Sequence, residues 1–224
     1  MKTITTTTFV MDFSELNEGC KAKTVTNTTF VMDFSELNAE QKTSAIELVR
    51  EREKNLNDDY FSESEIEYYK ETVLPEYGIN DAEIQFSGFW SQGDGASIST
   101  DHVDAVKFLR KVRALTKYRS IRHLLNEDDL AMSVKRSHSH YSHENTVSGY
   151  IESAYTDLTA KQETLVNELE ELLTETIREL SRKLYRDLEN AYEDQFTTEN
   201  ITALIEGNEY QFNVINGVVE SIEY

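Results

Sequence analysis

The sequence has little cysteine and no long apolar run, and each shortage excludes a class of protein. A single cysteine, Cys20, excludes an internal disulfide. No apolar run reaches the ~18 residues that a transmembrane helix needs, and the amino terminus lacks the apolar region of a signal peptide. We therefore expect a protein of a reducing cytoplasm that does not enter a membrane.

Basic residues are also scarce relative to acidic ones. The chain has 22 lysines and arginines against 42 aspartates and glutamates, which gives a formal net charge of −20. Such a charge repels phosphate backbones and membrane surfaces and steers the chain toward basic partners. We therefore expect a basic partner and no direct binding to nucleic acid; the alternative is that the charge serves solubility alone.

The only tryptophan and three of the eight glycines fall within residues 82–100. Apolar residues from Ile84 to Trp90 form one arm, and Gly93-Asp94-Gly95 provides a turn that can take positive φ before the chain returns. The pattern predicts a β-hairpin. We expect Asp94 to fix its turn through backbone amides rather than to act as a general base.

The run 86–97, FSGFWSQGDGAS, resembles a stretch found in small proteins of tailed bacteriophages. Most of these are described as hypothetical, and a few are loosely labelled antitoxin-like. The Tyr/His-rich segment 138–150 is a second, shorter similarity. The resemblance implies a phage origin and a bacterial host cytoplasm, and it brings no catalytic residues with it.

The amino-terminal segment is duplicated. Residues 2–17 recur at 23–38 with only two differences, and both copies alternate β-branched and apolar residues. Each copy is therefore predicted to form a strand of about eight residues. The two strands either pair as neighbours or compete for one position, which leaves one of them redundant.

The remaining pattern predicts an α+β fold in which an antiparallel sheet of hairpins is covered by helices, with a long C-terminal helix. We divide it into a strand segment 1–38, a core 39–157 and a helix with a hairpin 158–224, together forming one domain. The predicted elements are helices at 39–57, 62–74, 100–117, 159–196 and 198–207, and hairpins at 132–155 and around Asn216-Gly217.

The helix 159–196 is longer than a compact domain of this size needs. Its roughly 38 residues would extend beyond 50 Å, with leucines and isoleucines at steps of three and four. Part of it therefore packs on a second copy of the chain, or it breaks near Asn190 and folds back. The first alternative predicts a homo-oligomer.

An acidic segment rich in tyrosine is the candidate partner surface. From Asp58 to Glu83 there are nine acids and one base, interleaved with aromatic residues. Tyrosine supplies rigid contact area and carboxylates supply charge, although a solvated helix face gives the same pattern. Together with the central hairpin, the predicted contact residues are Asp58, Asp59, Glu63, Glu65, Glu67, Tyr68, Glu71, Trp90, Gln92 and Asp94.

The charge reverses at residues 107–122, where seven bases occur without an acid. This segment either pairs with the acidic helices of the chain itself, which we favour, or holds an anionic ligand.

Three histidines form the only cluster with the spacing of metal ligands. His138 and His140 would point the same way from one strand, with His143 at the following turn. The sequence therefore allows a zinc or other divalent transition-metal site, although serine- and histidine-rich hairpins are often only polar surface. Such a site would make the chain a small metal-dependent hydrolase or nucleotide-binding enzyme.

These features favour a non-enzymatic function. We expect an acidic, phage-encoded effector that binds and inhibits a bacterial host or defence protein, as anti-CRISPR proteins do, with carboxylates standing in for phosphates. The alternatives are the metal-dependent enzyme and an antitoxin-like binder of a basic toxin. No cofactor is expected for the effector.

Overall fold

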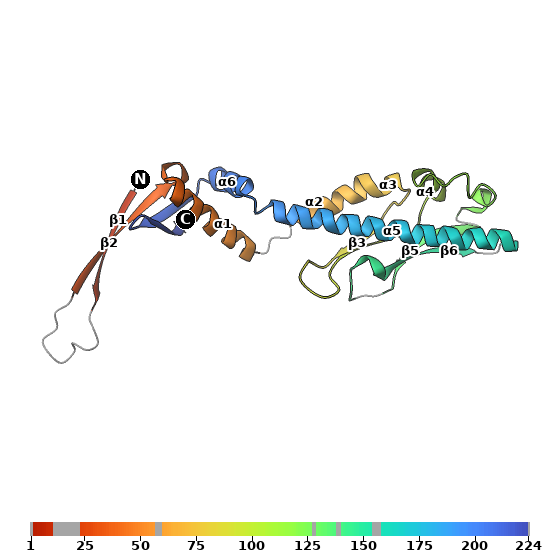
Figure 1. The fold of residues 1–224 in the computed structure, drawn as a ribbon, viewed down its shortest axis with the longest axis horizontal. Coiled ribbons are helices and arrows are strands. Elements are labelled where there is room, and N and C mark those ends of the chain that lie inside the picture. Colours follow the sequence, from red (N-terminus) through yellow and green to blue (C-terminus); the bar gives the residue numbers. More distant parts are fainter. Residues whose placement is uncertain are drawn as a thin grey trace, which may run out of the picture. The chain divides into compact units, whose positions relative to one another are not determined.

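The computed structural model describes residues 2–10, 23–56, 60–126, 129–137, 140–153 and 158–223. It confirms an α+β fold with antiparallel sheets and one long helix (Figure 1). The chain divides into two compact units: unit 1 comprises Met1–Asp58 and Glu193–Tyr224, and unit 2 comprises Asp59–Tyr192. Each unit has its own hydrophobic core.

The sheet of unit 1 contains both copies of the duplicated segment. Its strand order is β1 (Lys2–Val10), β2 (Lys23–Asp33), β7 (Gln211–Ile215) and β8 (Val218–Glu223), and all neighbours are antiparallel. The two copies are neighbouring strands with Thr6 opposite Asn27, so of the two alternatives the first, pairing as neighbours, is confirmed. Cys20 lies outside the described residues.

The turn between β7 and β8 follows from its sequence. Asn216 and Gly217 both have positive φ, 52° and 85°, as a two-residue hairpin turn matching the strand twist requires. The predicted C-terminal hairpin is therefore confirmed.

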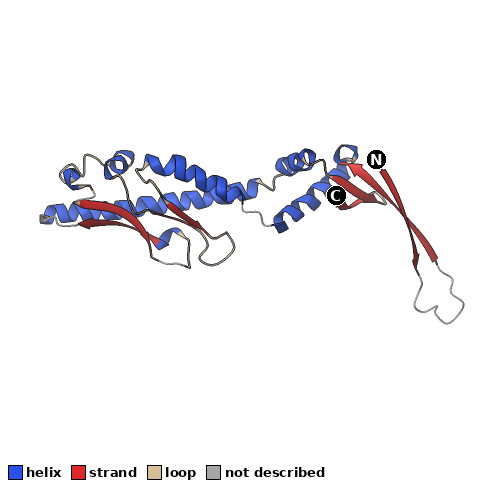
Figure 2. Cartoon of the chain, turned by 180° about the vertical axis from the view of Figure 1, so that it is seen from behind, coloured by secondary structure: helices blue, strands red, loops and turns tan. Residues whose placement is uncertain are grey.

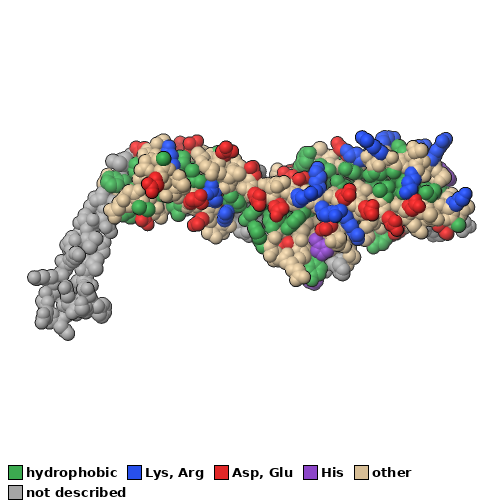
Figure 3. Space-filling view, viewed as in Figure 1, with side chains coloured by type: hydrophobic (Ala, Val, Ile, Leu, Met, Phe, Trp, Pro, Cys, Tyr) green, Lys and Arg blue, Asp and Glu red, His purple; other side chains and the backbone are tan. Residues whose placement is uncertain are grey.

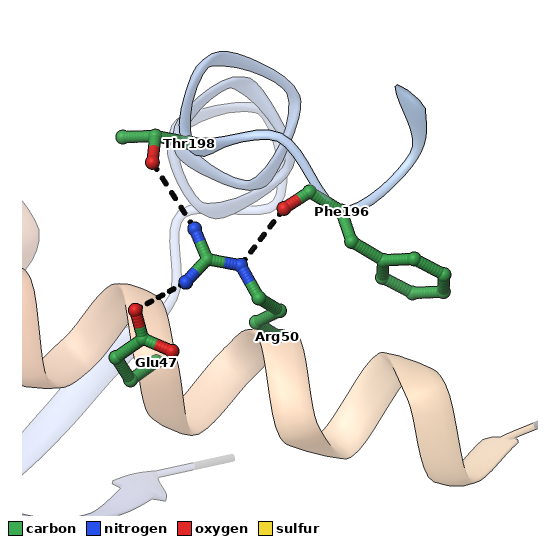
Figure 4. A network of polar contacts seen from close by, with 4 residues as sticks. All are labelled: Glu47, Arg50, Phe196 and Thr198. Carbon is green, nitrogen blue, oxygen red and sulfur yellow. Dashed lines mark hydrogen bonds and ion pairs between the residues drawn. The ribbon is translucent and has the colours of Figure 1, made fainter. Parts of the chain in front are cut away.

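Two helices cover the sheet of unit 1: α1 (Ala39–Leu56) and α6 (Thr198–Gly207). As predicted, α1 begins with a capping box, in which the backbone amides of Asn38 and Gln41 each donate to the other's side chain at 3.0 Å. Arg50 of α1 ties the two helices together. Its guanidinium donates to the Phe196 carbonyl at 2.8 Å and to the Thr198 hydroxyl at 3.1 Å, and it pairs with Glu47 (Figure 4).

Unit 2 is built along the helix α5 (Ala160–Asp194), which confirms the predicted long helix. It does not break near Asn190, so that alternative is wrong. Two hairpins pack on it: β3 (Glu83–Phe86) with β4 (Ala96–Ser99), and β5 (Leu130–Arg136) with β6 (Val147–Ser153). Figure 2 shows both hairpins lying along the same side of α5.

The apolar stripe of α5 is covered within unit 2. Its buried residues include Leu169, Leu173, Ile177 and Leu184, all fully buried in the core that the hairpins complete. A Cβ atom on Gly149 of β6 would lie 2.7 Å from Leu173, so only glycine allows this close approach. The stripe that suggested self-association therefore already has its partner within the chain.

Pro75 lies in the last turn of the helical segment between residues 60 and 76. The segment runs as α2 (Tyr60–Tyr68), a π-helical turn η3 (Tyr69–Val73) and α3 (Leu74–Glu76). Proline has no N–H to donate to the carbonyl four residues earlier in an α-helix. A π-helical turn is a known local adjustment of an α-helix. The helix thus ends one residue beyond Pro75 rather than before it.

The helix predicted at 100–117 is much shorter in the structure. α4 spans Ala105–Lys111, and the Asp104 carboxylate caps it by accepting from the amides of Val106 and Lys107. Thr100 instead bridges to Val134 of β5 through two backbone hydrogen bonds. The helix ends early because Arg113 adopts a left-handed conformation with φ of 58°.

Three short 3₁₀ helices complete the fold: η2 (Phe34–Glu36), η4 (Arg122–Leu124) and η5 (Glu144–Thr146). Within the described ranges, no helix is both long enough and apolar enough to cross a bilayer.

Candidate functional site

The loop between β3 and β4 exposes the single tryptophan. Trp90 is 83% exposed, the highest value for a large hydrophobic side chain in the described part of the chain. The Asp94 carboxylate accepts hydrogen bonds from the backbone amides of Trp90 and Ser91, at 2.9 and 2.6 Å. Gly93 has φ of 93°, so the turn uses the positive φ that the sequence predicts. The expected turn-fixing role of Asp94 is confirmed.

Trp90 rests on a cluster of aromatic rings from α2, the β3–β4 hairpin and α5. Its ring centroid lies 6.3 Å from that of Phe89 and 6.2 Å from that of Tyr192. Phe89 is the centre of the cluster, with centroids at 5.1 to 6.1 Å in Phe61, Phe86, Tyr185 and Tyr192. Such pairs contribute about 0.5–1.5 kcal/mol each beyond burial. The exposed indole therefore lies against a buttress of packed aromatic rings.

A second loop, between β5 and β6, packs directly on the first. The Ser142 amide donates to the Gly93 carbonyl at 3.1 Å. A Cβ atom on Gly93 would collide with the ring of Tyr141, and one on Gly95 would lie 2.5 Å from the Cα of His143. These two glycines are therefore required for the close approach of the loops.

Four of the exposed residues of these two loops form what we call the Trp90 surface: Trp90, Gln92, His140 and Tyr141. The loops project from the same side of α5 (Figures 1 and 2). Negative charge lies near its base, since burial and then Glu189 and Asp94 raise the pKa of Tyr185. The surface thus combines an aromatic anchor with an acidic setting.

The acidic helix places its predicted contact residues in two directions. Glu63, Glu67 and Glu71 are exposed at intervals of four residues, and Tyr68 beside them is 53% exposed. Residues Asp58 and Asp59 lie outside the described residues. The helix reaches the Trp90 loop through Phe61, whose ring centroid is 6.1 Å from that of Phe89.

Glu65 points toward α5 rather than outward with the other carboxylates. Partial burial and then the charge of Asp187 raise its pKa. Asp187 in turn accepts a hydrogen bond of 2.6 Å from the hydroxyl of the fully buried Tyr69. Burial, followed by this bond, raises the pKa of Tyr69, which therefore stays a neutral donor. This group joins α5 to the helical segment.

The histidines are arranged differently from the predicted strand pair. β5 ends at Arg136, so His140 does not belong to a strand, and His138 lies outside the described residues. His143 caps η5 instead: its Nδ1 accepts a hydrogen bond of 3.2 Å from the Asn145 amide. The described residues contain no group of three His, Cys, Asp or Glu side chains positioned to hold a metal.

The aromatic base of the Trp90 surface was not predicted. Tyr185 and Tyr192 lie seven residues apart on α5, which places them on one helix face, and this spacing was the available signal. Tyr141 was missed because nothing in the sequence indicates that the two hairpin loops meet.

These observations define an α+β unit in which two hairpins pack along one helix and an exposed tryptophan lies on a cluster of aromatic rings. Residues 61–198 match the family model described as Domain of unknown function (DUF8835), and the chain belongs to this family. The match covers nearly all of unit 2. No curated protein and no solved structure matches the chain.

Proposed function

We propose that this protein is a non-enzymatic effector that binds another protein through the Trp90 surface. The observation that carries the proposal is a tryptophan that is 83% exposed and yet fixed by a turn and an aromatic base. Tryptophan is enriched among the residues that dominate binding energy, and an anchor ordered in advance loses little entropy on binding. Solvent exposure of this indole has a cost that a partner would remove.

The partner has a basic surface. The net charge of −20 and the exposed Glu63, Glu67 and Glu71 attract cations over long range and accelerate encounter at low salt. Nucleic-acid-binding proteins present such basic surfaces, and a row of carboxylates competes there with phosphates. We therefore infer inhibition by occupation of the nucleic-acid site.

The resemblance of residues 86–97 to small phage proteins supplies the biological setting. It supports a bacterial host or defence protein as the target, in the manner of an anti-CRISPR protein, and a basic toxin as the second candidate. Both targets need the same acidic binder, so the identity of the captured protein distinguishes them.

The test is capture of partners from a nuclease-treated bacterial lysate by the tagged full-length chain. It compares wild type with Trp90→Ala, each at low and at physiological salt. The matched control is Tyr150→Ala, which removes a 38% exposed aromatic ring on β6, away from the Trp90 loop. Nuclease treatment removes proteins held only through bound nucleic acid.

The proposal predicts a basic protein that is retained by wild type and by Tyr150→Ala, is lost with Trp90→Ala, and elutes as salt rises. Retention by Trp90→Ala would contradict the Trp90 surface. Retention that does not depend on salt would contradict the charge-based mechanism.

A further inference from the structure

Unit 2 carries a second charged surface of the opposite sign. Residues 105–126 contain no acid, and the structure describes this stretch completely. Its bases lie on α4 and on the turns that follow it, and Lys and Arg side chains gather along that edge of the unit (Figure 3). The sequence led us to expect that these bases pair with the acidic helices.

Only the lysines of this stretch meet that expectation. Lys111 pairs with Glu76, Lys117 with Glu168 at 2.9 Å, and Lys107 with Asp104 at 3.9 Å. The four arginines are all exposed and make no ion pair with any described residue; they are Arg110, Arg113, Arg119 and Arg122. We call these four residues the arginine face. In a chain with 20 excess negative charges, four exposed guanidinium groups on one short stretch that holds no acid are a local excess of positive charge.

The arginine face has no apolar centre. None of the exposed large hydrophobic residues in the described part of the chain falls between 105 and 126. A protein–protein interface normally has a desolvated apolar core, whereas contacts to a phosphate backbone need only cations and donors. The composition of this face therefore fits a polyanion better than a protein.

The arginine face is separate from the pocket at the start of α4. A pocket of about 240 Å³ lies beside the start of α4, and none of the four arginines lines it. The arginines instead follow α4 and the turns after it, as contacts to an extended chain of phosphates would. Guanidinium groups suit this role because their planar donors match phosphate oxygens in pairs.

Arg113 carries a local backbone cost. Its φ of 58° is a conformation that glycine usually supplies after a helix, and arginine is disfavoured there by about 1–2 kcal/mol. The Ala114 amide closes the turn on the Leu109 carbonyl at 2.8 Å. Glycine would close the same turn with less strain.

We propose that the arginine face binds the phosphate backbone of a nucleic acid. The net charge of the chain does not prevent this, because charges beyond a Debye length of about 8–10 Å are largely screened at moderate salt. The inference goes beyond the protein-binding role and does not depend on it, since the two surfaces share no residue.

The test measures fluorescence anisotropy of labelled single-stranded DNA, RNA and duplex DNA of about 20 nucleotides, longer than a typical single-strand site. The full-length chain is titrated at several salt concentrations. The variant is Arg113→Glu/Arg119→Glu. The control is Arg182→Glu/Arg186→Glu, which makes the same charge change at two exposed positions of α5. Circular dichroism verifies that all three proteins are folded.

We expect wild type to bind at about 0.1 M salt, where the negative charge elsewhere on the chain is screened, with log affinity on duplex falling by about 3–4 per tenfold rise in salt if all four arginines contact phosphates. For the Arg113/Arg119 variant, the slope of log affinity against log salt should fall by about 2, and the affinity should fall by at least about tenfold. The affinity of the control should fall by less than about twofold.

Three results would overturn the inference. The first is the absence of binding to every probe at about 0.1 M salt. The second is equal weakening of the variant and the control, because then only net charge matters. The third is that polyglutamate with the same number of charges displaces the labelled probe as well as unlabelled nucleic acid does. The face would then bind an acidic protein rather than a nucleic acid. Trp90→Ala should bind the probes like wild type, so failure of the protein-binding proposal is recognised separately.

Discussion

The Trp90 surface and the arginine face lie in the same unit but differ in composition: one presents aromatic side chains and the other presents cations. The Trp90 surface presents two exposed aromatic side chains, Trp90 and Tyr141, and the Asp94 carboxylate fixes the Trp90 loop by accepting hydrogen bonds from backbone amides. The arginine face has four exposed cations and no exposed large hydrophobic residue. Apolar anchors suit a protein partner and exposed cations suit phosphates, which is why we propose a different kind of partner for each surface.

Both surfaces depend on α5. The aromatic base of Trp90 includes Tyr185 and Tyr192, and the basic segment is tied to the same helix through the pair Lys117–Glu168. A variant that destabilises the core around α5 should therefore affect both surfaces, whereas a variant in one surface should affect that surface alone.

The largest effect is expected for Leu173→Ala. Leu173 is fully buried against Gly149, and removing such a side chain costs about 2–5 kcal/mol of unfolding free energy. Urea unfolding followed by Trp90 fluorescence should show this loss. Partner capture and nucleic-acid binding should both be lost at the same urea concentration. Glu171→Ala, at an exposed position of the same helix, should change stability by less than about 0.5 kcal/mol. If one of these two binding activities were lost at a lower urea concentration than the other, the two surfaces would not share a core.

Gly95→Ala should damage only the Trp90 surface. The added Cβ atom meets the backbone of His143 at 2.5 to 2.9 Å, so the loops must separate, at a cost of about 1–3 kcal/mol. Partner capture should weaken while nucleic-acid binding stays unchanged. Gly207→Ala is the control, because its Cβ atom meets nothing within 4 Å. Equal partner capture by Gly95→Ala and wild type would mean that the packing of the loops is irrelevant to binding.

Arg113→Gly should have opposite effects on stability and binding. Relief of the left-handed conformation should raise the unfolding free energy by up to about 1 kcal/mol, while loss of the cation should lower the salt slope on nucleic acid by about 1. Arg110→Ala should lower the slope similarly without the gain in stability. If Arg113→Gly were more stable and bound nucleic acid as wild type does, Arg113 would not belong to the contact.

Glu65 gives the smallest predicted effect, seen as a dependence of stability on pH. Its pKa is raised from an ordinary value of 4.5, so the folded state binds its proton more tightly than the unfolded state. Its favourable contribution is complete below the unfolded pKa and is lost as pH rises through the folded pKa. Glu65→Gln should therefore raise the melting temperature at pH 7, and the difference from wild type should vanish below about pH 4.

The matched variant for this measurement is Glu67→Gln, which removes the same charge from the exposed side of α2. It should leave the pH dependence of melting as in wild type. A pH-independent difference between Glu65→Gln and wild type would contradict the assigned effect of burial and Asp187.

The elements that were predicted correctly are those with strong local signals. The capping box at Asn38, the Asn216-Gly217 turn and the apolar period of α5 each depend on residues close in sequence. The helix after Thr100 was predicted too long because apolar spacing continues beyond Lys111, while the left-handed Arg113 that ends it has no glycine to reveal it. A π-turn before Pro75 has no comparable sequence signal.

The candidate site could be predicted only in part, because it is assembled from distant segments. Trp90 and Asp94 were found from their own loop, whose turn chemistry is local. The contact of that loop with Tyr141 and the aromatic base on α5 needed the fold, since they join residues 50 to 100 positions apart. The strand expected to carry His140 ends at Arg136, and His138 lies outside the described residues, so the metal site stays a prediction. Pairing of each base likewise depends on which acid the fold brings near.

The most direct test of the account is the affinity of the captured, purified partner for wild type, Trp90→Ala and Tyr150→Ala. A central anchor contributes at least about 2 kcal/mol, so Trp90→Ala should bind at least about 30-fold more weakly, while Tyr150→Ala should stay within about threefold of wild type. If Trp90→Ala also bound within about threefold of wild type, the Trp90 surface would not be the binding site.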